Sequence, residues 1–354
     1  MAEAAMTADT AASGKEGDAR AEGPADAAGA AEYVIDVRNL RKSFAGREVV
    51  HGIALKVRRG EIYGFLGPNG SGKTTTIRML CGLLTPDAGE GHCLGYDILR
   101  ESRQIKLHVG YMTQQFSLYA DLTVLENLAF MARVHGMPQP LALARKKAEE
   151  MGLADRMHQL AGTLSGGWKQ RLALTACTLH EPELLLLDEP TAGVDPRARR
   201  DFWNSIHALA AKGVTVLVST HYMDEAERCH ELAYIYNGRI LARGPVRRIM
   251  AESGLFAYAV SGPQKRLEAL AERLQKENAV EIATFRGEAL HLAGRDRERL
   301  QATVKEICAH NDLSCQPAEP TLEDVFIHFM NTAGGRAQIT GAIAPDEKAR
   351  EAGS

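Results

Sequence analysis

One glycine-rich segment, residues 67–75, constrains the fold of this 354-residue chain more than any other stretch. Its sequence, GPNGSGKTT, fits the pattern G-x-x-x-x-G-K-[ST] and lies between an apolar run at 62–66 and a helix-like pattern at 75–81. Glycines let a main chain curl around phosphate groups without Cβ clashes, so that backbone N–H groups can surround them. The start of the following helix adds partial positive charge. The sequence therefore predicts a strand–loop–helix unit that binds a nucleoside triphosphate.

Two side chains of this segment have defined roles in that prediction. Lys73 places a positive charge against the β- and γ-phosphates, and the Thr74 hydroxyl is suited to ligate Mg²⁺. A glycine-rich turn arising by chance is the alternative, and the matching elements on both sides disfavour it. The residues predicted to contact the nucleotide are Gly67, Pro68, Asn69, Gly70, Ser71, Gly72, Lys73, Thr74 and Thr75.

The composition of the whole chain limits the classes of protein to consider. A net charge of −3 disfavours a nucleic-acid-binding surface, and we expect no nucleic acid partner. The chain has no run of about 18 apolar residues and no secretory signal pattern at its start, which predicts a cytosolic protein without its own membrane span. Six scattered cysteines without a C-x-x-C pair favour reduced thiols. Cys308 and Cys315 could pair sterically, but we do not expect them to do so.

Four consecutive leucines at 184–187 precede two acidic residues, Asp188 and Glu189. Such a run is typical of a strand buried on both faces of a parallel sheet, and ligands bind at the carboxyl ends of such strands. We therefore expect Asp188 to reach Mg²⁺ through water and Glu189 to polarise an attacking water. A second strand-like run, 214–219, leads to His221 at the same edge, where a γ-phosphate contact is favoured over a purely structural histidine.

Four further residues are candidates for the same site. Gln114 follows a possible strand at 108–112, and its amide can donate to or accept from water or the ligands of Mg²⁺. Ser165 precedes two glycines at the start of an apolar-periodic helix, which indicates either a second phosphate-binding helix start or a plain N-cap. Phe44 is either a stacking platform for the nucleotide base or a half-buried core residue. Asp195 lies in a segment with the composition of a turn.

Changes in composition along the chain predict its division into parts. The first 31 residues are rich in Ala, Gly, Asp and Glu and bury too little to fold, and the last residues are polar and rich in Gly and Ala. The predicted parts are a disordered tail (1–31), a nucleotide-binding domain (32–250) with a helical subdomain (about 115–180), a small C-terminal domain (251–331) and a flexible tail (332–354).

Local periodicity supports the two structured parts. Amphipathic helices are predicted at 122–133 and 141–151, within the helical subdomain. After residue 250, strand and helix patterns follow the order βαββαβ, which is the ferredoxin-like order of elements. A closing helix at 321–330 could pack back on the first domain.

Taken together, the motifs between about residues 33 and 250 resemble those of the ATP-binding cassette (ABC) ATPases. The segment 164–170, LSGGWKQ, resembles the signature that separates this family from other P-loop proteins. The resemblance implies an α/β P-loop cassette with a mixed, largely parallel sheet, an antiparallel β part and the helical subdomain, followed by the small α+β domain. It assigns adenine stacking to Phe44, the Q-loop to Gln114, ATP contacts from the signature to Ser165, Gly166, Gly167 and Gln170, the metal-linked acid to Asp188, the catalytic glutamate to Glu189, the D-loop to Asp195 and the switch histidine to His221.

The resemblance also implies cofactors and partners. It implies ATP and Mg²⁺, with Thr74, Gln114 and Asp188 around the metal, and a homodimer that closes over two ATP molecules. The end of the C-terminal domain, 320–326, resembles the daunorubicin-resistance type of drug exporter ATPase. This implies a subunit on the cytoplasmic face of the membrane that energises a separately encoded permease. Two departures from the family pattern are Trp168 in the signature and Phe44 in place of the common Tyr.

Other functions remain as alternatives at this point. A cassette ATPase that acts on DNA or ribosomes would typically need a long coiled coil between the phosphate loop and the signature, or two cassettes in one chain. A nucleotide-binding regulator without turnover is disfavoured by Glu189 and His221. An importer subunit would more often carry a larger, β-rich regulatory domain.

Overall fold

The structure is a computed structural model that describes residues 32–274, 279–310 and 313–334. The predicted tail 1–31 and all but the first three residues of the predicted tail 332–354 lie outside the described residues. Those three residues continue the last helix, α12 (Leu322–Gly334), which runs beyond the predicted end at 330. Here the structure differs from the expected tail, because the helix continues through a polar stretch without a proline to stop it.

A six-stranded sheet forms the centre of the molecule, in the order β10-β9-β3-β8-β7-β6. All neighbours are parallel except β10, which is antiparallel to β9. The strands are β10 (Arg239–Gly244), β9 (Glu231–Tyr236), β3 (Ile62–Leu66), β8 (Thr215–Thr220), β7 (Leu184–Asp188) and β6 (Val109–Met112). Every residue of β7 is buried, so the leucine run forms the doubly covered strand that it predicts.

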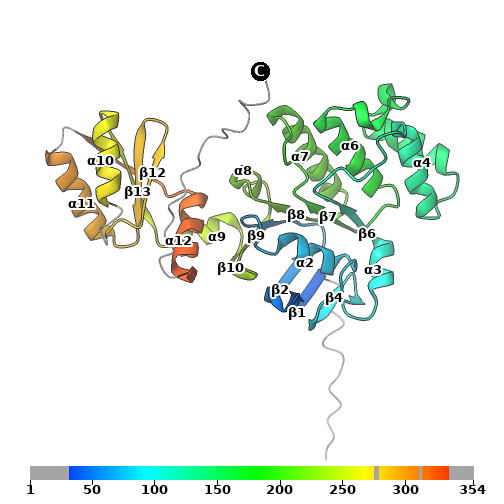
Figure 1. Cartoon of the computed structure of the whole chain (residues 1–354), viewed down its shortest axis with the longest axis horizontal. Coiled ribbons are helices and arrows are strands. Elements are labelled where there is room, and N and C mark those ends of the chain that lie inside the picture. Colours follow the sequence, from blue (N-terminus) through cyan, green and yellow to red (C-terminus); the bar gives the residue numbers. More distant parts are fainter. Residues whose placement is uncertain (1–31, 275–278, 311–312, 335–354) are drawn as a thin grey trace, which may run out of the picture.

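A second, antiparallel sheet lies beside the first, in the order β2-β1-β4-β5 (Figure 1). Its strands are β1 (Tyr33–Phe44), β2 (Arg47–Arg58), β4 (Ala88–Cys93) and β5 (Tyr96–Asp97). Helix α2 (Lys73–Leu80) shares one hydrophobic core with both sheets, in which Val37, Leu55, Phe65 and Ile77 are buried. This core fixes the phosphate loop, which joins β3 to α2.

The helices between β6 and β7 have a hydrophobic core of their own, which includes Val124, Leu128, Ala144 and Leu172. They are α4 (Val124–Val134), α5 (Pro140–Glu150), the 3₁₀ turns η1 (Ala154–Arg156) and η2 (Ala161–Thr163), and α6 (Gly166–Cys177). The two predicted amphipathic helices are present, each shifted by one or two residues. Four other helices surround the central sheet: α3 (Ser102–His108), α7 (Pro196–Ala211), α8 (Met223–Ala226) and α9 (Val246–Glu252).

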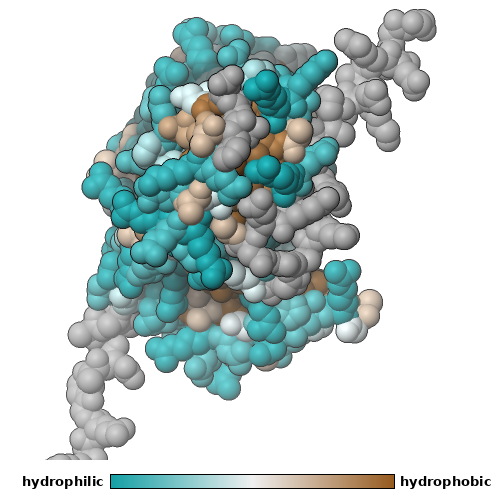
Figure 2. All heavy atoms as spheres, turned by 90° about the vertical axis from the view of Figure 1, so that its left-hand side faces the viewer, coloured by the Kyte–Doolittle hydropathy of each residue, from teal (hydrophilic) through white to brown (hydrophobic). Residues whose placement is uncertain are grey.

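The C-terminal elements form a four-stranded antiparallel sheet in the order β12-β13-β11-β14. Their order along the chain is β11 (Phe256–Ser261), α10 (Gln264–Leu274), β12 (Ile282–Arg286), β13 (Ala289–Gly294), α11 (Arg297–His310) and β14 (Ser314–Ala318). This confirms the predicted βαββαβ order. Both helices share a hydrophobic core with the sheet. Hydrophilic residues cover most of the face that this part presents in Figure 2, with hydrophobic residues in small groups between them.

Helix α12 lies between the C-terminal elements and the central sheet (Figure 1). On one side the Phe326 ring stacks on Tyr234 of β9, with centroids 3.9 Å apart. On the other side Asp324, which is fully buried, is 2.9 Å from His291 Nε2 of β13. Apolar contacts on one side of α12 and polar contacts on the other therefore join the two parts of the chain.

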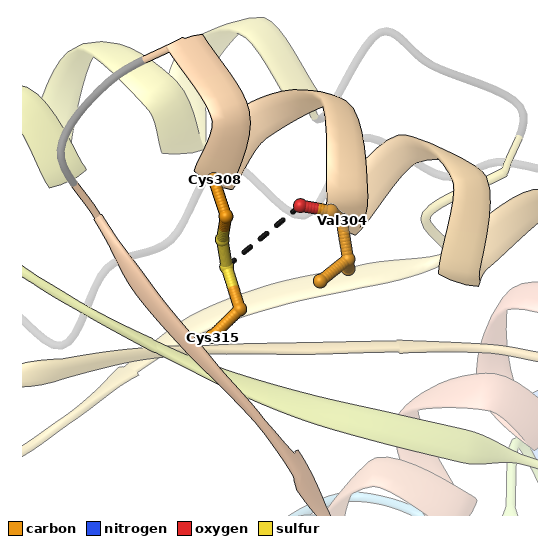
Figure 3. Close-up of a disulfide and its surroundings, with 3 residues drawn as sticks. All are labelled: Val304, Cys308 and Cys315. Atoms are coloured by element: carbon orange, nitrogen blue, oxygen red, sulfur yellow. Dashed lines mark hydrogen bonds between the residues drawn. A yellow bond between two sulfur atoms is a disulfide. The ribbon is translucent and has the colours of Figure 1, made fainter.

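The prediction that all six cysteines are reduced is wrong for one pair. Cys308 at the end of α11 and Cys315 at the start of β14 form a disulfide (Figure 3). The end of α11 and the start of β14 lie close together, so the two Cα atoms are 6.3 Å apart, a separation that a disulfide spans. The other four cysteines, Cys81, Cys93, Cys177 and Cys229, are free.

Candidate active site

The phosphate loop joins β3 to α2 with backbone geometry that requires glycine. Gly70 and Gly72 have φ angles of 78° and 102°, in the left-handed region. A Cβ atom on Gly67 would lie 2.2 Å from the carbonyl oxygen of Ile235. The buried Ser71 hydroxyl finds no hydrogen-bond partner among the described residues, and the first turn of α2 contains no acidic residue. Such a loop fits an anionic ligand, which would accept hydrogen bonds from the Ser71 hydroxyl and from the N–H groups at the start of α2.

Lys73 and Glu189, predicted from separate motifs, form a buried ion pair. Lys73 Nζ lies 3.1 Å from Glu189 Oε1 and also donates to the carbonyl oxygens of Gly67 at 2.7 Å and Pro68 at 3.1 Å. The side chains are only 4% and 8% exposed. The phosphate loop and the carboxyl end of β7 therefore meet at one point, as the strand order predicts.

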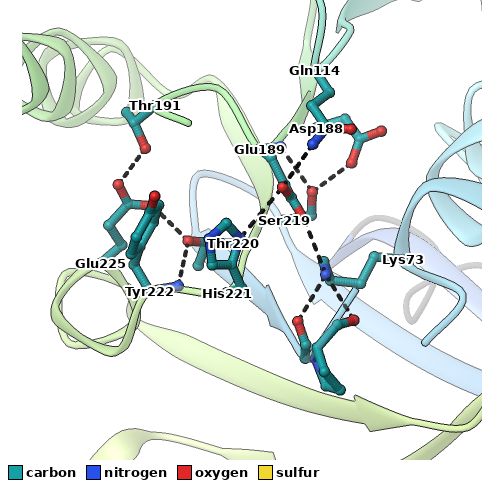
Figure 4. A network of polar contacts seen from close by, with 12 residues as sticks. Lys73, Gln114, Asp188, Glu189, Thr191, Ser219, Thr220, His221, Tyr222 and Glu225 are labelled. Carbon is teal, nitrogen blue, oxygen red and sulfur yellow. Dashed lines mark hydrogen bonds and ion pairs between the residues drawn. The ribbon is translucent and has the colours of Figure 1, made fainter. Parts of the chain in front are cut away.

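The second carboxylate oxygen of Glu189 meets two other predicted residues (Figure 4). Gln114 Nε2 donates to Glu189 Oε2 at 2.9 Å, and His221 Nδ1 lies 3.3 Å from the same oxygen. Glu189 has a φ angle of 46°, a conformation that costs about 1 kcal/mol or more for a residue with a side chain. The strained backbone directs the carboxylate out of the strand toward these partners.

Asp188 lies on β7 directly before Glu189 and is 1% exposed. Ser219 of β8 donates through Oγ to Asp188 Oδ1 at 2.7 Å, and the same Oγ accepts from the Glu189 N–H at 3.0 Å. Ser219 therefore holds both acidic residues in register. From the sequence, Ser219 was expected only as a strand residue, although a polar residue at the end of an apolar β-branched run is a signal that could have identified it.

Signature residues at the N-terminal end of α6 and the D-loop residue at that of α7 line a pocket that no residue of the Glu189 group lines. Ser165 is the N-cap of α6, and among the described residues its hydroxyl makes no capping hydrogen bond, so it is not the plain cap of the alternative interpretation. This pocket, of ≈ 290 Å³, is lined by α6, α7 and their caps, including Ser165, Gly167 and Asp195. Gly166 is exposed, and Gln170 is half-buried further along α6.

Three other predicted or unusual residues have distinct environments. The Asp195 side chain caps α7 by accepting from the N–H groups of Arg197 at 3.1 Å and Ala198 at 3.0 Å. Phe44, at the end of β1, is 47% exposed, so it is not a core residue and its ring is accessible for stacking. Two guanidinium groups contact the Trp168 ring, with that of Arg156 4.4 Å and that of Arg171 4.9 Å from the ring centre.

A phosphate loop beside an acidic strand end defines a P-loop nucleotide-binding protein, and comparison with known proteins identifies its family. The sequence pattern of the ABC transporter family matches residues 50–192. Nod factor export ATP-binding protein I of Paraburkholderia xenovorans is 38% identical over 302 residues, 84% of this chain and 97% of that protein. This chain belongs to the ABC transporter ATP-binding proteins.

Two further similarities agree with this family. The probable multidrug ABC transporter ATP-binding protein YbhF of Escherichia coli is 44% identical over 225 residues, 63% of this chain. The chain matches only 39% of the length of that relative. A crystal structure of the ADP conformation of an ATP-binding cassette of an ABC transporter superposes with a TM-score of 0.55 and 27% identity, over 60% of this chain and 91% of the other. The predicted family, cassette fold and nucleotide binding are thereby confirmed.

Proposed function

We propose that this chain binds and hydrolyses ATP as the nucleotide-binding subunit of an exporter, with a separately encoded permease that spans the membrane. The contact of Lys73 with Glu189, which Gln114 and His221 also reach, carries the proposal. Both relatives have names that refer to multidrug transport or Nod factor export, which supports export of drugs or other hydrophobic compounds. None of the helices within the described ranges has the length and hydrophobicity of a membrane span. We place the subunit on the cytoplasmic face of the membrane, bound to its permease.

The donor set around the phosphate loop fits ATP together with Mg²⁺. Thr74, Gln114 and Asp188 offer hydroxyl, amide and carboxylate oxygens, which are the ligands that Mg²⁺ prefers alongside phosphates and water. Within the described residues, His, Cys, Asp and Glu side chains form no cluster of three that could ligate a metal ion. The proposed cation would be shared with the nucleotide, where it would neutralise phosphate charge.

Glu189 is the residue proposed to orient the attacking water. Lys73 pairs with one of its oxygens, and Gln114 donates to the other, which His221 Nδ1 approaches to 3.3 Å. Because phosphate oxygens attract Lys73 more strongly than one carboxylate does, ATP binding would draw Lys73 away and release Glu189 Oε1. That oxygen could then accept a hydrogen bond from water placed in line with the γ-phosphate.

A second copy of the chain completes the site in this proposal. The pocket at the caps of α6 and α7 is lined by Ser165 and Gly167, and it does not include the Glu189 group. In a symmetric dimer, these residues of one copy would face the ATP of the other, with charge-assisted hydrogen bonds closing the interface. The ring of Trp168, which two arginines contact, would form a rigid part of that interface.

The short helices of the helical subdomain support transport over action on DNA or ribosomes, and a separate hydrophobic core supports the proposed domain division. Helices α4, α5 and α6 have 11, 11 and 12 residues and pack on one core, without the long coiled coil of that alternative. The separate core of the C-terminal elements supports our division into domains at about residue 250.

The test is a pull-down of tagged Glu189→Gln protein with ATP from detergent-solubilised membranes of the native cell. The substitution should keep ATP bound and the dimer closed, so that partners are retained. Glu183→Gln is the matched control, because Glu183 is an exposed acid just before β7 that pairs with Arg59. Recovery of a polytopic membrane protein would support the proposal. Recovery of ribosomes or DNA-bound proteins without a membrane partner would contradict it, and so would absence of ATP hydrolysis by the wild-type protein.

A further inference from the structure

Glu225 in α8 is a fully buried carboxylate that the proposed mechanism does not use. Its Oε1 accepts a hydrogen bond from the Thr191 hydroxyl and lies 3.5 Å from Arg199 Nε. Its Oε2 accepts from the Thr220 hydroxyl at 2.6 Å. A charge without access to water is retained only when such partners surround it, so these contacts hold Glu225 in one position.

The partners of Glu225 belong to segments that carry the reactive groups (Figure 4). Thr191 stands two residues after Glu189, and Thr220 directly precedes His221. Arg199 is on α7, in the turn capped by the predicted D-loop residue. One side chain therefore joins the loop after β7, the loop after β8 and α7.

The loop that carries His221 is held on both of its sides. The Thr220 hydroxyl, which donates to Glu225, accepts from the Tyr222 N–H at 3.0 Å. The guanidinium carbon of Arg199 lies 4.4 Å from the centre of the Tyr222 ring. The position of His221 relative to Glu189, now 3.3 Å between Nδ1 and Oε2, thus depends on the buried network below it.

We infer that Glu225 is a positioning residue for ATP hydrolysis, which sets the distance between Glu189 and His221. The inference rests on the proposed function. A carboxylate can accept from two hydroxyls at once, whereas an amide of the same shape offers one acceptor and one donor. Glutamine at this position therefore keeps the volume but replaces one acceptor by a donor, so that one hydroxyl must reverse its role and both links lose the strength of a charged acceptor. The phosphate loop meets this network only indirectly in the described residues, where the Gly67 N–H donates to the Thr220 carbonyl oxygen at 3.3 Å, so ATP binding is expected to change less than hydrolysis.

The first test compares Glu225→Gln with Asp224→Asn in the full-length chain. Asp224 is a matched control because it is the preceding residue and its carboxylate lies 3.7 Å from Arg199, but its side chain is 61% exposed. We expect Glu225→Gln to lower kcat about tenfold or more while the KM for ATP changes less than about twofold. Asp224→Asn should stay within about twofold of wild type in both constants. Equal kcat for Glu225→Gln and wild type would overturn the inference.

A second test separates positioning from a general loss of structure. If Glu225 acts through His221, the double variant Glu225→Gln/His221→Ala should hydrolyse ATP no more slowly than His221→Ala alone. Losses that multiply in the double variant would overturn the inference. Thr220→Val, compared with Thr220→Ser, tests the same link if Glu225→Gln fails to fold, and valine is expected to reproduce the loss of kcat while serine restores it. Wild-type and Asp224→Asn proteins that both lack ATPase activity would instead refute the proposed function.

Discussion

Because Glu189 pairs with Lys73, we expect Glu189→Gln to lower the stability of the nucleotide-free protein and to raise its affinity for ATP. Removal of one member of a buried ion pair typically costs about 3–5 kcal/mol. Lys73 keeps two carbonyl acceptors, at 2.7 and 3.1 Å, so we expect the nucleotide-free variant to lose about 2 kcal/mol of unfolding free energy. With ATP bound, phosphate oxygens replace the lost acceptor, and the loss should vanish. By linkage, about 2 kcal/mol corresponds to ATP binding that is about 30-fold tighter.

The assay is urea unfolding with and without ATP, together with a direct titration of ATP binding. Glu183→Gln serves as the control, since its carboxylate is exposed and the expected change is below about 0.5 kcal/mol. The reasoning would be refuted if Glu189→Gln left both the nucleotide-free stability and the ATP affinity unchanged. Weaker ATP binding by the variant would also refute it, because the carboxylate would then assist Lys73 and not compete for it.

Three further predictions follow from single contacts. Gly67→Ala should abolish ATP binding, measured by titration, because its Cβ would lie 2.2 Å from a carbonyl oxygen of β9. Phe326→Ala should lower the unfolding free energy by about 3–5 kcal/mol in urea, because this fully buried ring stacks on Tyr234. Burial alone would raise the pKa of Asp324, but the hydrogen bond with His291 contributes to holding it below 3.8. Its stabilising effect should therefore be present above pH 3.8 and lost as the pH falls through the lower folded-state pKa, and Asp324→Asn should flatten this acid dependence in urea unfolding at different pH values.

Helix α12 gives the small C-terminal domain a physical connection to the nucleotide-binding domain. Phe326 packs on β9, a direct neighbour of β3, whose end leads into the phosphate loop. Asp324, two residues earlier, contacts β13 of the other sheet. Movements of the C-terminal domain would therefore act on the central sheet through one helix, and the Phe326 and Asp324 substitutions test the two sides of this connection separately.

Features with strong local patterns were predictable from the sequence. The leucine run at 184–187 identified a doubly buried strand, since only a parallel sheet covered on both faces accommodates it. The βαββαβ order was predictable because each element has its own period and turn residues. The length of the first strand was less predictable, because β1 runs from Tyr33 to Phe44 through several irregularities of register, where alternation breaks down.

The sequence by itself determined which residue types the candidate site contains, because the phosphate loop, the acidic strand end and His221 are each specified within a few consecutive residues. Only the tertiary structure decided which of these groups touch. Glu225 and Thr191 lie 34 residues apart, and no local pattern indicates their contact. Cys308 and Cys315 are close enough in sequence to pair, but whether they do depends on where α11 ends and β14 begins. Such pairings depend on how strands and helices return to one another. The relative placement of strands and helices is set by packing of the whole chain, and short-range sequence patterns do not encode it.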